Sequence, residues 1–224
     1  PPKVWAWKKK RLQQIKQYVD QVAVIFPFEV DFYQSHAIKA HYVGNPTASA
    51  MPKLPSIANC QKAIGIEGKP LITILPGSRN SEIHHHQALL IDTIKMLHRQ
   101  KPDLSFALAM APQISCDGFR AELKDYPVHI LKDQTYQAIK AADIVLCASG
   151  TATLETALIG TPMLIFYRFS AITYAIAKHF VKIPYAGLCN ILAQKLIAPE
   201  FIQDQANPMR LCEEALELLN NKKQ

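Results

Sequence analysis

The chain has 224 residues, of which 49% are apolar and 19% charged, and it carries a formal net charge of +7 with a pI near 9.1. These values are those of an ordinary globular protein with one large or two small domains. The basic excess suits nucleic acid, an anionic membrane or phosphorylated substrates, and net charge alone does not choose among them.

Five scattered cysteines, with no C-x-x-C pair, argue against a zinc site and a disulfide framework and fit a reducing cytosol. No apolar run is long enough to cross a membrane, and we expect no signal peptide. The chain begins Pro1-Pro2 without a methionine and enters at once on Val4-Trp5-Ala6-Trp7. We therefore expect it to be a portion of a longer polypeptide.

Residues 1–48 alternate between helix and strand signals. Apolar residues recur at helical spacing across 8–19, whereas the apolar run 21–26 ends at a proline and is typical of a strand. A short helix is expected over 29–35 and a short strand over 41–43. This order predicts the last βαβ-like units of a parallel sheet, the tail of an N-terminal Rossmann-like domain whose first part is absent.

Residues 49–69 are polar and marked by prolines, with a small helix over 57–64, and are predicted to form a linker. A new alternation then defines a second domain over 70–224. Its strands are expected over 71–75, 104–109, 128–130, 141–146 and 162–167. Its helices are expected over 81–100, 118–124, 134–141, 171–181 and 208–220. A further short helix that includes Leu154, Ala157 and Leu158 is expected to stop at Gly160. Such alternation predicts an α/β domain with a doubly wound parallel sheet, whose ligands bind at the carboxyl ends of the strands.

The first such carboxyl end carries the sequence Leu75-Pro76-Gly77-Ser78-Arg79-Asn80-Ser81-Glu82. Gly77 and Ser78 offer backbone and hydroxyl donors, and Arg79 can grip a phosphate through two nitrogens. The alternative is a capped helix start with a solvated arginine. The loop is neither a Walker motif nor a dinucleotide fingerprint, because it lacks their spacing. We interpret it as a phosphate-binding loop.

A second loop connects the strand over 141–146 to the next helix. Its small and hydroxyl-bearing residues are Ser149, Gly150, Thr151, Ala152 and Thr153. Gly150 lets the backbone approach a ligand, and the first helical N–H groups favour a bound diphosphate. Glu155 would then accept hydrogen bonds from a ribose diol. An ordinary strand-to-helix turn capped by Ser149 or Thr151 is the alternative, and the absence of a G-x-S-x-G frame argues against a serine hydrolase.

Three further polar features leave alternatives open. Asn190 lies among apolar residues, so it either staples a loop or contacts a substrate. Arg168 either serves the same anion as Arg79 or pairs with Glu155. The histidines at 84–86 point in different directions on a helix and lack a partner ligand, so we expect a solvated face and no metal site.

The aromatic N-terminal segment also has two interpretations. Trp5 and Trp7 lie beside the basic run Lys8-Lys9-Lys10-Arg11. Together they could face a membrane surface or an amphiphilic substrate. The alternative is packing into a core.

Several motifs together resemble one known family. They are Val4-Trp5-Ala6-Trp7 before a basic helix, Phe26-Pro27-Phe28-Glu29 with Phe32-Tyr33, Val43-Gly44-Asn45-Pro46, Leu75 to Glu82, Ala148 to Glu155, Tyr167-Arg168, and Asn190-Ile191-Leu192-Ala193. In this order and spacing the chain resembles the lipid-A-disaccharide synthases, over essentially all of its length.

The resemblance implies a glycosyltransferase with two Rossmann-like domains (GT-B type), whose second domain holds the nucleotide sugar. It implies transfer of 2,3-diacylglucosamine from its UDP conjugate to 2,3-diacylglucosamine 1-phosphate, with inversion and without a metal or other cofactor. Arg79 matches an essential arginine, and Asn190 an asparagine important for activity; we assign both as catalytic. The UDP-binding residues are expected to be Gly77, Ser78, Arg79, Ser149, Gly150, Thr151, Ala152, Thr153, Glu155 and Arg168.

The resemblance also implies a setting for the whole protein. The expected location is the cytoplasm, at the surface of the inner membrane, with a possible homodimer and no nucleic-acid partner. The family's first domain, with its acidic catalytic residue, is absent, so the chain alone is not expected to be a competent enzyme. Two other functions stay open: a UDP-sugar transferase or epimerase acting on a different substrate, and a non-catalytic UDP-sugar-binding module.

Overall fold

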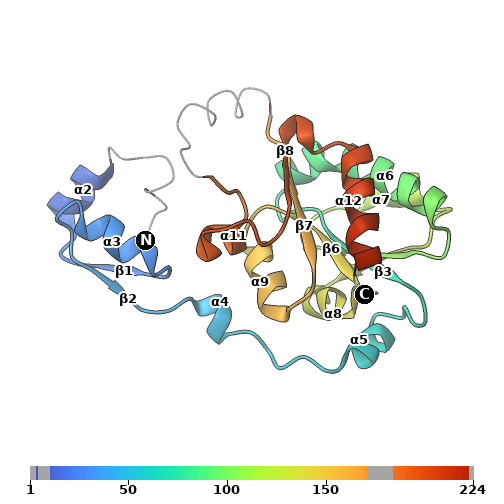
Figure 1. Cartoon of the computed structure of the whole chain (residues 1–224), viewed down its shortest axis with the longest axis horizontal. Coiled ribbons are helices and arrows are strands. Elements are labelled where there is room, and N and C mark those ends of the chain that lie inside the picture. The colour runs from blue at the N-terminus through green and yellow to red at the C-terminus, as the bar shows by residue number, and fades with distance from the viewer. Residues whose placement is uncertain (1–3, 5–10, 171–183, 222–224) are drawn as a thin grey trace. The chain divides into compact units, whose positions relative to one another are not determined.

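The computed structural model describes residue 4 and the ranges 11–170 and 184–221 (Figure 1). These residues fall into two compact units, one formed by the described residues up to Pro52 together with Pro184, and the other by Lys53–Ser170 and the chain from Tyr185 onward. The helix expected over 171–181 and the pair Trp5 and Trp7 lie outside the described residues.

The first unit contains the expected parallel βαβ arrangement. Its elements are α2 (Arg11–Tyr18), β1 (Val22–Val24), α3 (Phe28–Gln34), β2 (Ala40–Tyr42) and α4 (Pro46–Ser49). Strands β1 and β2 run parallel, with Val22 opposite Ala40. The side chains of Val24 and Tyr33 are fully buried between the strands and α3, so this unit has a small core of its own.

The second unit is built on a six-stranded parallel sheet, which confirms the doubly wound α/β prediction. Its strands are β3 (Leu71–Leu75), β4 (Ser105–Met110), β5 (Val128–Lys132), β6 (Ile144–Ala148), β7 (Met163–Tyr167) and β8 (Glu200–Ile202). Its helices are α5 (Ile57–Ala63), α6 (Asn80–Gln100), α7 (Asp117–Leu123), α8 (Thr135–Ala141), α9 (Thr151–Ile159), α11 (Leu188–Ala193) and α12 (Pro208–Asn221), with a 3-10 turn η1 (Gln203–Gln205).

The strand order β5-β4-β3-β6-β7-β8 places the change of direction between β3 and β6. The chain proceeds outward from β3 to β5, then returns to the other side of β3 and proceeds outward to β8. Leu75 at the end of β3 lies opposite Cys147 in β6. The loops after these two strands therefore begin at the same level, at the position where ligands bind in open parallel sheets.

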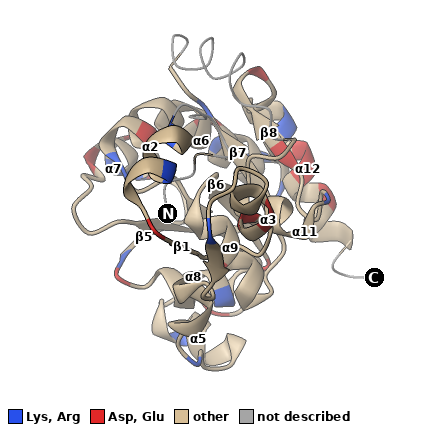
Figure 2. Ribbon diagram, turned by 90° about the vertical axis from the view of Figure 1, so that its left-hand side faces the viewer, with Lys and Arg blue, Asp and Glu red and all other residues tan. Residues whose placement is uncertain are grey.

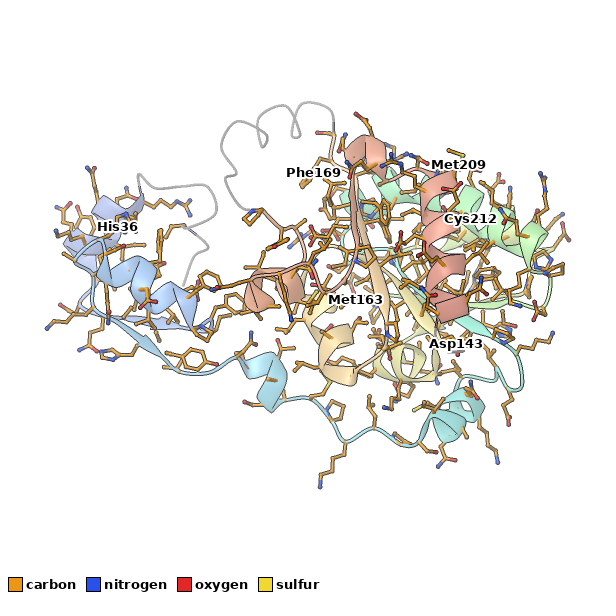
Figure 3. All side chains as sticks on the ribbon, in the orientation of Figure 1. His36, Asp143, Met163, Phe169, Met209 and Cys212 are labelled. Atoms are coloured by element: carbon orange, nitrogen blue, oxygen red, sulfur yellow. The ribbon has the colours of Figure 1, made fainter. Side chains whose placement is uncertain are left out.

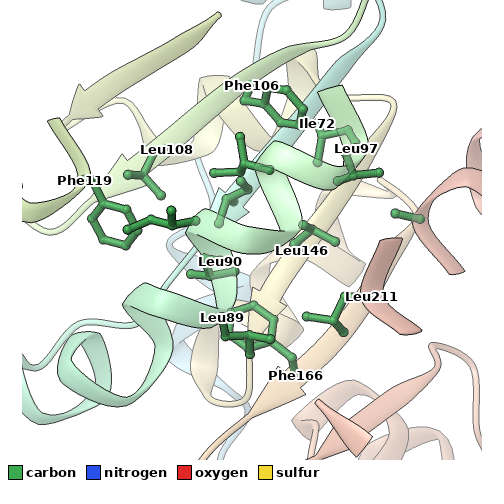
Figure 4. Packing of buried hydrophobic residues seen from close by; sticks show 14 of the residues in the cluster. Ile72, Leu89, Leu90, Leu97, Phe106, Leu108, Phe119, Leu146, Phe166 and Leu211 are labelled. Atoms are coloured by element: carbon green, nitrogen blue, oxygen red, sulfur yellow. The ribbon is translucent and has the colours of Figure 1, made fainter. Parts of the chain in front are cut away.

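Both faces of this sheet are covered, which explains why its strands are continuous apolar runs. On one face Ile72, Phe106 and Leu146 pack against Leu90 of α6 and Leu211 of α12 (Figure 4). The other face is covered by α5 and α8, and it includes the alternate side chains of the same strands. In Figure 3, Asp143, just before β6, marks the amino ends of the strands, and Phe169, just after β7, marks their carboxyl ends.

The structure corrects the sequence prediction at two short segments. Strand β6 begins at Ile144 and not at residue 141, because α8 continues to Ala141 and the Asp143 carboxylate accepts the N–H of Leu71 at 2.9 Å. The second segment contains α11 and β8, which no periodic pattern indicated because they span six and three residues.

Candidate functional site

The loop between β3 and α6 is held in shape by the carboxylate of Glu82. One oxygen, Oε2, accepts the N–H groups of Ser78 at 2.8 Å and Arg79 at 3.3 Å. The other, Oε1, lies 2.9 Å from Nη1 of Arg79. Because the Glu82 side chain is 11% exposed and that of Arg79 is 75% exposed, the guanidinium is anchored at one nitrogen and otherwise open to solvent.

Gly77 is required for this loop. Its φ of +122° lies in a region that other residues rarely adopt, and a Cβ atom would lie 2.8 Å from the Cβ of Glu82. The loop thus closes tightly over the Glu82 side chain, and the backbone comes close to the first turn of α6.

Tyr167, the last residue of β7, contacts the β3–α6 loop although β7 lies two strands from β3 in the sheet. Its hydroxyl donates to Oε1 of Glu82 at 3.2 Å. Burial, followed by the negative charge of Glu82, raises the pKa of Tyr167 to about 12. The phenol therefore stays protonated at neutral pH and remains a hydrogen-bond donor.

His86 is fully buried, so the expected solvated histidine face is wrong at this position. Its Nδ1 lies 2.7 Å from the carbonyl of Pro76, and its Nε2 accepts the N–H of Arg168 at 3.1 Å. Since a carbonyl only accepts and an amide N–H only donates, the proton belongs on Nδ1. Burial lowers the pKa of His86, and the neutral ring connects the β3–α6 loop to the end of β7.

Arg168 and Glu155 have separate partners. The Nε of Arg168 donates to the carbonyl of Ala206 at 2.8 Å. Glu155 accepts a hydrogen bond from the hydroxyl of Tyr136 at 3.0 Å. The alternative in which Arg168 pairs with Glu155 is therefore not the arrangement in the structure.

The loop between β6 and α9 combines internal bonds with open donors. Gly150 has φ +155° and ψ −158°, a region essentially restricted to glycine. The hydroxyl of Thr153 donates to the carbonyl of Gly150 at 2.8 Å. Within the part of the chain that the structure describes, the N–H groups of Thr151 and Ala152 have no hydrogen-bond partner, so the first turn of α9 can receive an anion.

Asn190 is fully buried and uses its whole side-chain amide inside the protein. Its Nδ2 donates to the carbonyl of Ala198 at 2.8 Å and to Glu200 at 2.7 Å. Its Oδ1 accepts the N–H groups of Ile197 at 2.9 Å and Ala198 at 3.0 Å. These four bonds match the stapling alternative, since an amide has two donors and two lone pairs.

Sequence reasoning did not find four side chains that shape the two loops, namely Glu82, His86, Tyr136 and Glu200. Glu82 was visible in the loop motif, but its inward direction depends on where α6 begins. Among the residues described, no group of three or more histidine, cysteine or acidic side chains could hold a metal ion. The helices described include none long and apolar enough to cross a membrane.

Comparison with known proteins adds sequence relatives. The family profile described as "Lipid-A-disaccharide synthetase" matches residues 1–224. The "Lipid-A-disaccharide synthase" of Chromobacterium violaceum is 39% identical over 219 residues, which cover 95% of this chain and 57% of that protein. "Lipid-A-disaccharide synthase 1" of Legionella pneumophila (strain Lens) is 38% identical over 226 residues, covering 100% of this chain and 59% of that protein. The chain thus spans under three fifths of the length of these curated relatives.

Solved structures agree on the fold. WaaG, described as a glycosyltransferase involved in lipopolysaccharide biosynthesis, matches 88% of this chain and 53% of its own, with a TM-score of 0.58 and 14% identity. The E. coli ADP-heptose lps heptosyltransferase II matches 92% of this chain and 64% of its own, with a TM-score of 0.56 and 12% identity. These likenesses support the GT-B type of architecture.

Proposed function

Because the chain belongs to the lipid-A-disaccharide synthase family, a family of glycosyltransferases, we propose that it binds the UDP-sugar donor of such an enzyme. The donor is UDP-2,3-diacylglucosamine and the acceptor is 2,3-diacylglucosamine 1-phosphate. In the proposed reaction an acceptor hydroxyl attacks C1 of the donor sugar, the bond from C1 to the diphosphate oxygen breaks, and UDP leaves. The hydroxyl proton passes to a base that we assign to no residue of this chain.

The observation that carries the proposal is the pair of loops after β3 and β6. They follow adjacent strands at the same level of the sheet, at its change of direction. One presents the exposed guanidinium of Arg79, and the other presents the open N–H groups of Thr151 and Ala152. Positive groups fixed before the reaction stabilise the charge that develops on a leaving diphosphate.

We propose separate roles for the surrounding residues. Gly77, Ser78 and Arg79 contact the diphosphate from one side, and the loop 149–153 contacts it from the other. Glu155 accepts hydrogen bonds from the ribose diol, and the hydroxyl of Tyr136 orients the Glu155 carboxylate by donating to its Oε1. Arg168 stabilises the β7 end of the site through its backbone bond to His86 and its side-chain bond to Ala206.

The proposed mechanism requires no metal ion, because the arginine and the helix N-terminus supply the positive potential that a metal would otherwise provide. Transfer should therefore continue in excess EDTA. Loss of transfer in EDTA, with recovery on addition of Mg²⁺, would contradict this part of the proposal.

From its membership of the family we propose two further features of the whole protein. They are association with the inner-membrane surface from the cytoplasmic side and a homodimer. Flotation with vesicles containing anionic lipid tests the first, and sedimentation equilibrium tests the second.

The experiment that tests the function is a transfer assay with the complete protein. The acylated donor is offered together with acylated or deacylated glucosamine 1-phosphate, and release of UDP and formation of the disaccharide are both measured. We expect both products only with the acylated acceptor. Equal use of a deacylated acceptor would indicate a transferase of different specificity, and UDP binding without any product would indicate a binding module.

A further inference from the structure

The carboxylate of Glu200, at the start of β8, accepts three hydrogen bonds from one short stretch of chain. Oε2 accepts the N–H of Ala186 at 2.7 Å, and Oε1 accepts the N–H of Gly187 at 2.8 Å. Oε1 also accepts Nδ2 of Asn190 at 2.7 Å. A carboxylate serves this arrangement because all three partners are N–H donors.

The same turn, residues 186–188, is bonded on its other side to the β6–α9 loop. The hydroxyl of Ser149 donates to the carbonyl of Ala186 at 2.8 Å. The hydroxyl of Thr153 accepts the N–H of Leu188 at 3.0 Å. These are two of the hydroxyl groups that we assign to the diphosphate-binding loop, so the turn determines where they point.

The packing leaves the turn little freedom. A Cβ atom at Gly187 would lie 2.4 Å from Cδ1 of Ile165 in β7 and 3.2 Å from Oε1 of Glu200. Glycine thus allows the backbone to approach both the sheet and the carboxylate. Since β7 and β8 pair with Ile165 opposite Glu200, the backbone of Glu200 is itself fixed by the sheet.

Asn190 is the third residue that donates a hydrogen bond to Glu200, besides Ala186 and Gly187. Both amide donors and the amide oxygen are used within the protein, and one of the donors orients Glu200. Its amide therefore has no donor or acceptor left for a substrate.

We propose that Glu200 is a positioning residue for the diphosphate-binding loop. It holds the turn 186–188, and the turn orients Ser149 and Thr153 at the start of α9. Asn190 acts through Glu200 and not on the reacting groups. This inference rests on the proposed function, because it concerns the same UDP-binding loop.

The test compares Glu200→Gln, Asn190→Ala and the double variant by titration with UDP. A glutamine side chain has one oxygen in place of two, so an NH2 group must face one of the N–H donors. We expect each single variant to weaken UDP binding about tenfold or more, the range for loss of one partner of a buried hydrogen bond. The double variant should bind UDP no more weakly than the single variant with the lower affinity. Glu213→Gln, a change at an exposed residue of α12, is the matched control with unchanged affinity (Asp and Glu residues are red on the ribbon in Figure 2).

The outcomes separate this inference from the proposed function. Wild-type affinity in a folded Glu200→Gln variant, or additive losses in the double variant, would overturn the positioning role and leave the function standing. Absence of UDP binding by the wild-type protein would instead overturn the function. If the variants do not fold, amide resonances of the wild-type protein decide: UDP should shift those of Ala186 and Gly187, and unshifted resonances in the saturated complex would overturn the inference.

Discussion

Arg79 and Glu82 lie three residues apart at the start of α6, and their side chains approach to 2.9 Å between Nη1 and Oε1. The same carboxylate also accepts the N–H of Arg79. The arginine is thus oriented before any ligand arrives, while most of its guanidinium stays exposed. Such preorganisation reduces the entropy lost when an anion binds.

Replacement of Arg79 should remove the main fixed cation of the site. We expect Arg79→Ala to lower kcat/KM for transfer by on the order of 100-fold or more, the range for loss of one preorganised charge-stabilising group. Arg79→Lys should recover only part of the loss, because an ammonium cannot make two parallel bonds to a phosphate. Arg99→Ala, an exposed arginine at the other end of α6, is the control. Unchanged turnover in Arg79→Ala would contradict the assignment.

Two glycines with positive φ allow the loop geometry to be tested separately from general backbone strain. Gly65 (φ +71°) has nothing within 4 Å of a built Cβ, whereas at Gly77 the Cβ of Glu82 is in the way. Gly65→Ala should cost about 1–2 kcal/mol of unfolding free energy and leave UDP affinity unchanged. Gly77→Ala should lower UDP affinity as well, because Glu82 and the loop must separate. Equal UDP affinities in the two variants would show that the close approach is unimportant.

Glu155 gives a test of sugar recognition. If its carboxylate accepts hydrogen bonds from the ribose diol, the wild-type protein should bind UDP more tightly than 2′-deoxy-UDP. Glu155→Gln should reduce this preference, and Tyr136→Phe should reduce it less, since the phenol only holds the carboxylate. The measurement is competition between the two nucleotides. A preference that survives intact in Glu155→Gln would exclude this contact.

His86 should make stability depend on pH. Its pKa is lowered by burial in the folded protein, so folding favours the neutral ring. The contribution to stability is therefore complete above the unfolded pKa of about 6.5 and is lost as pH falls toward the folded value. Urea unfolding at pH 8 and pH 5 should show this loss in the wild-type protein and a smaller one in His86→Asn. His84→Asn, an exposed neighbour, should behave like the wild-type protein.

The sequence allowed five of the six strands of the sheet and the positions of both loops to be predicted, because each depends on local signals. A buried run such as Leu71–Leu75 followed by Pro76-Gly77 has few alternatives to a strand and a turn. The side chains that fix the loops could not be predicted in this way. His86 was misjudged because the three histidines were treated as one polar group, although helical periodicity places residue 86 on the buried face of α6, between Ile83 and Leu90. Glu200 and Asn190 meet through α11 and β8, which are too short to produce a pattern, and their hydrogen bonds depend on tertiary contacts.

The most direct test of the account is a calorimetric titration of the 224-residue chain with UDP at low and high salt. We expect one site with micromolar affinity that weakens with salt, together with a large loss of affinity in Arg79→Ala and none in Arg99→Ala. Absence of binding by the folded chain, or equal affinity in Arg79→Ala, would contradict the claim that the loops after β3 and β6 hold the diphosphate of the sugar donor.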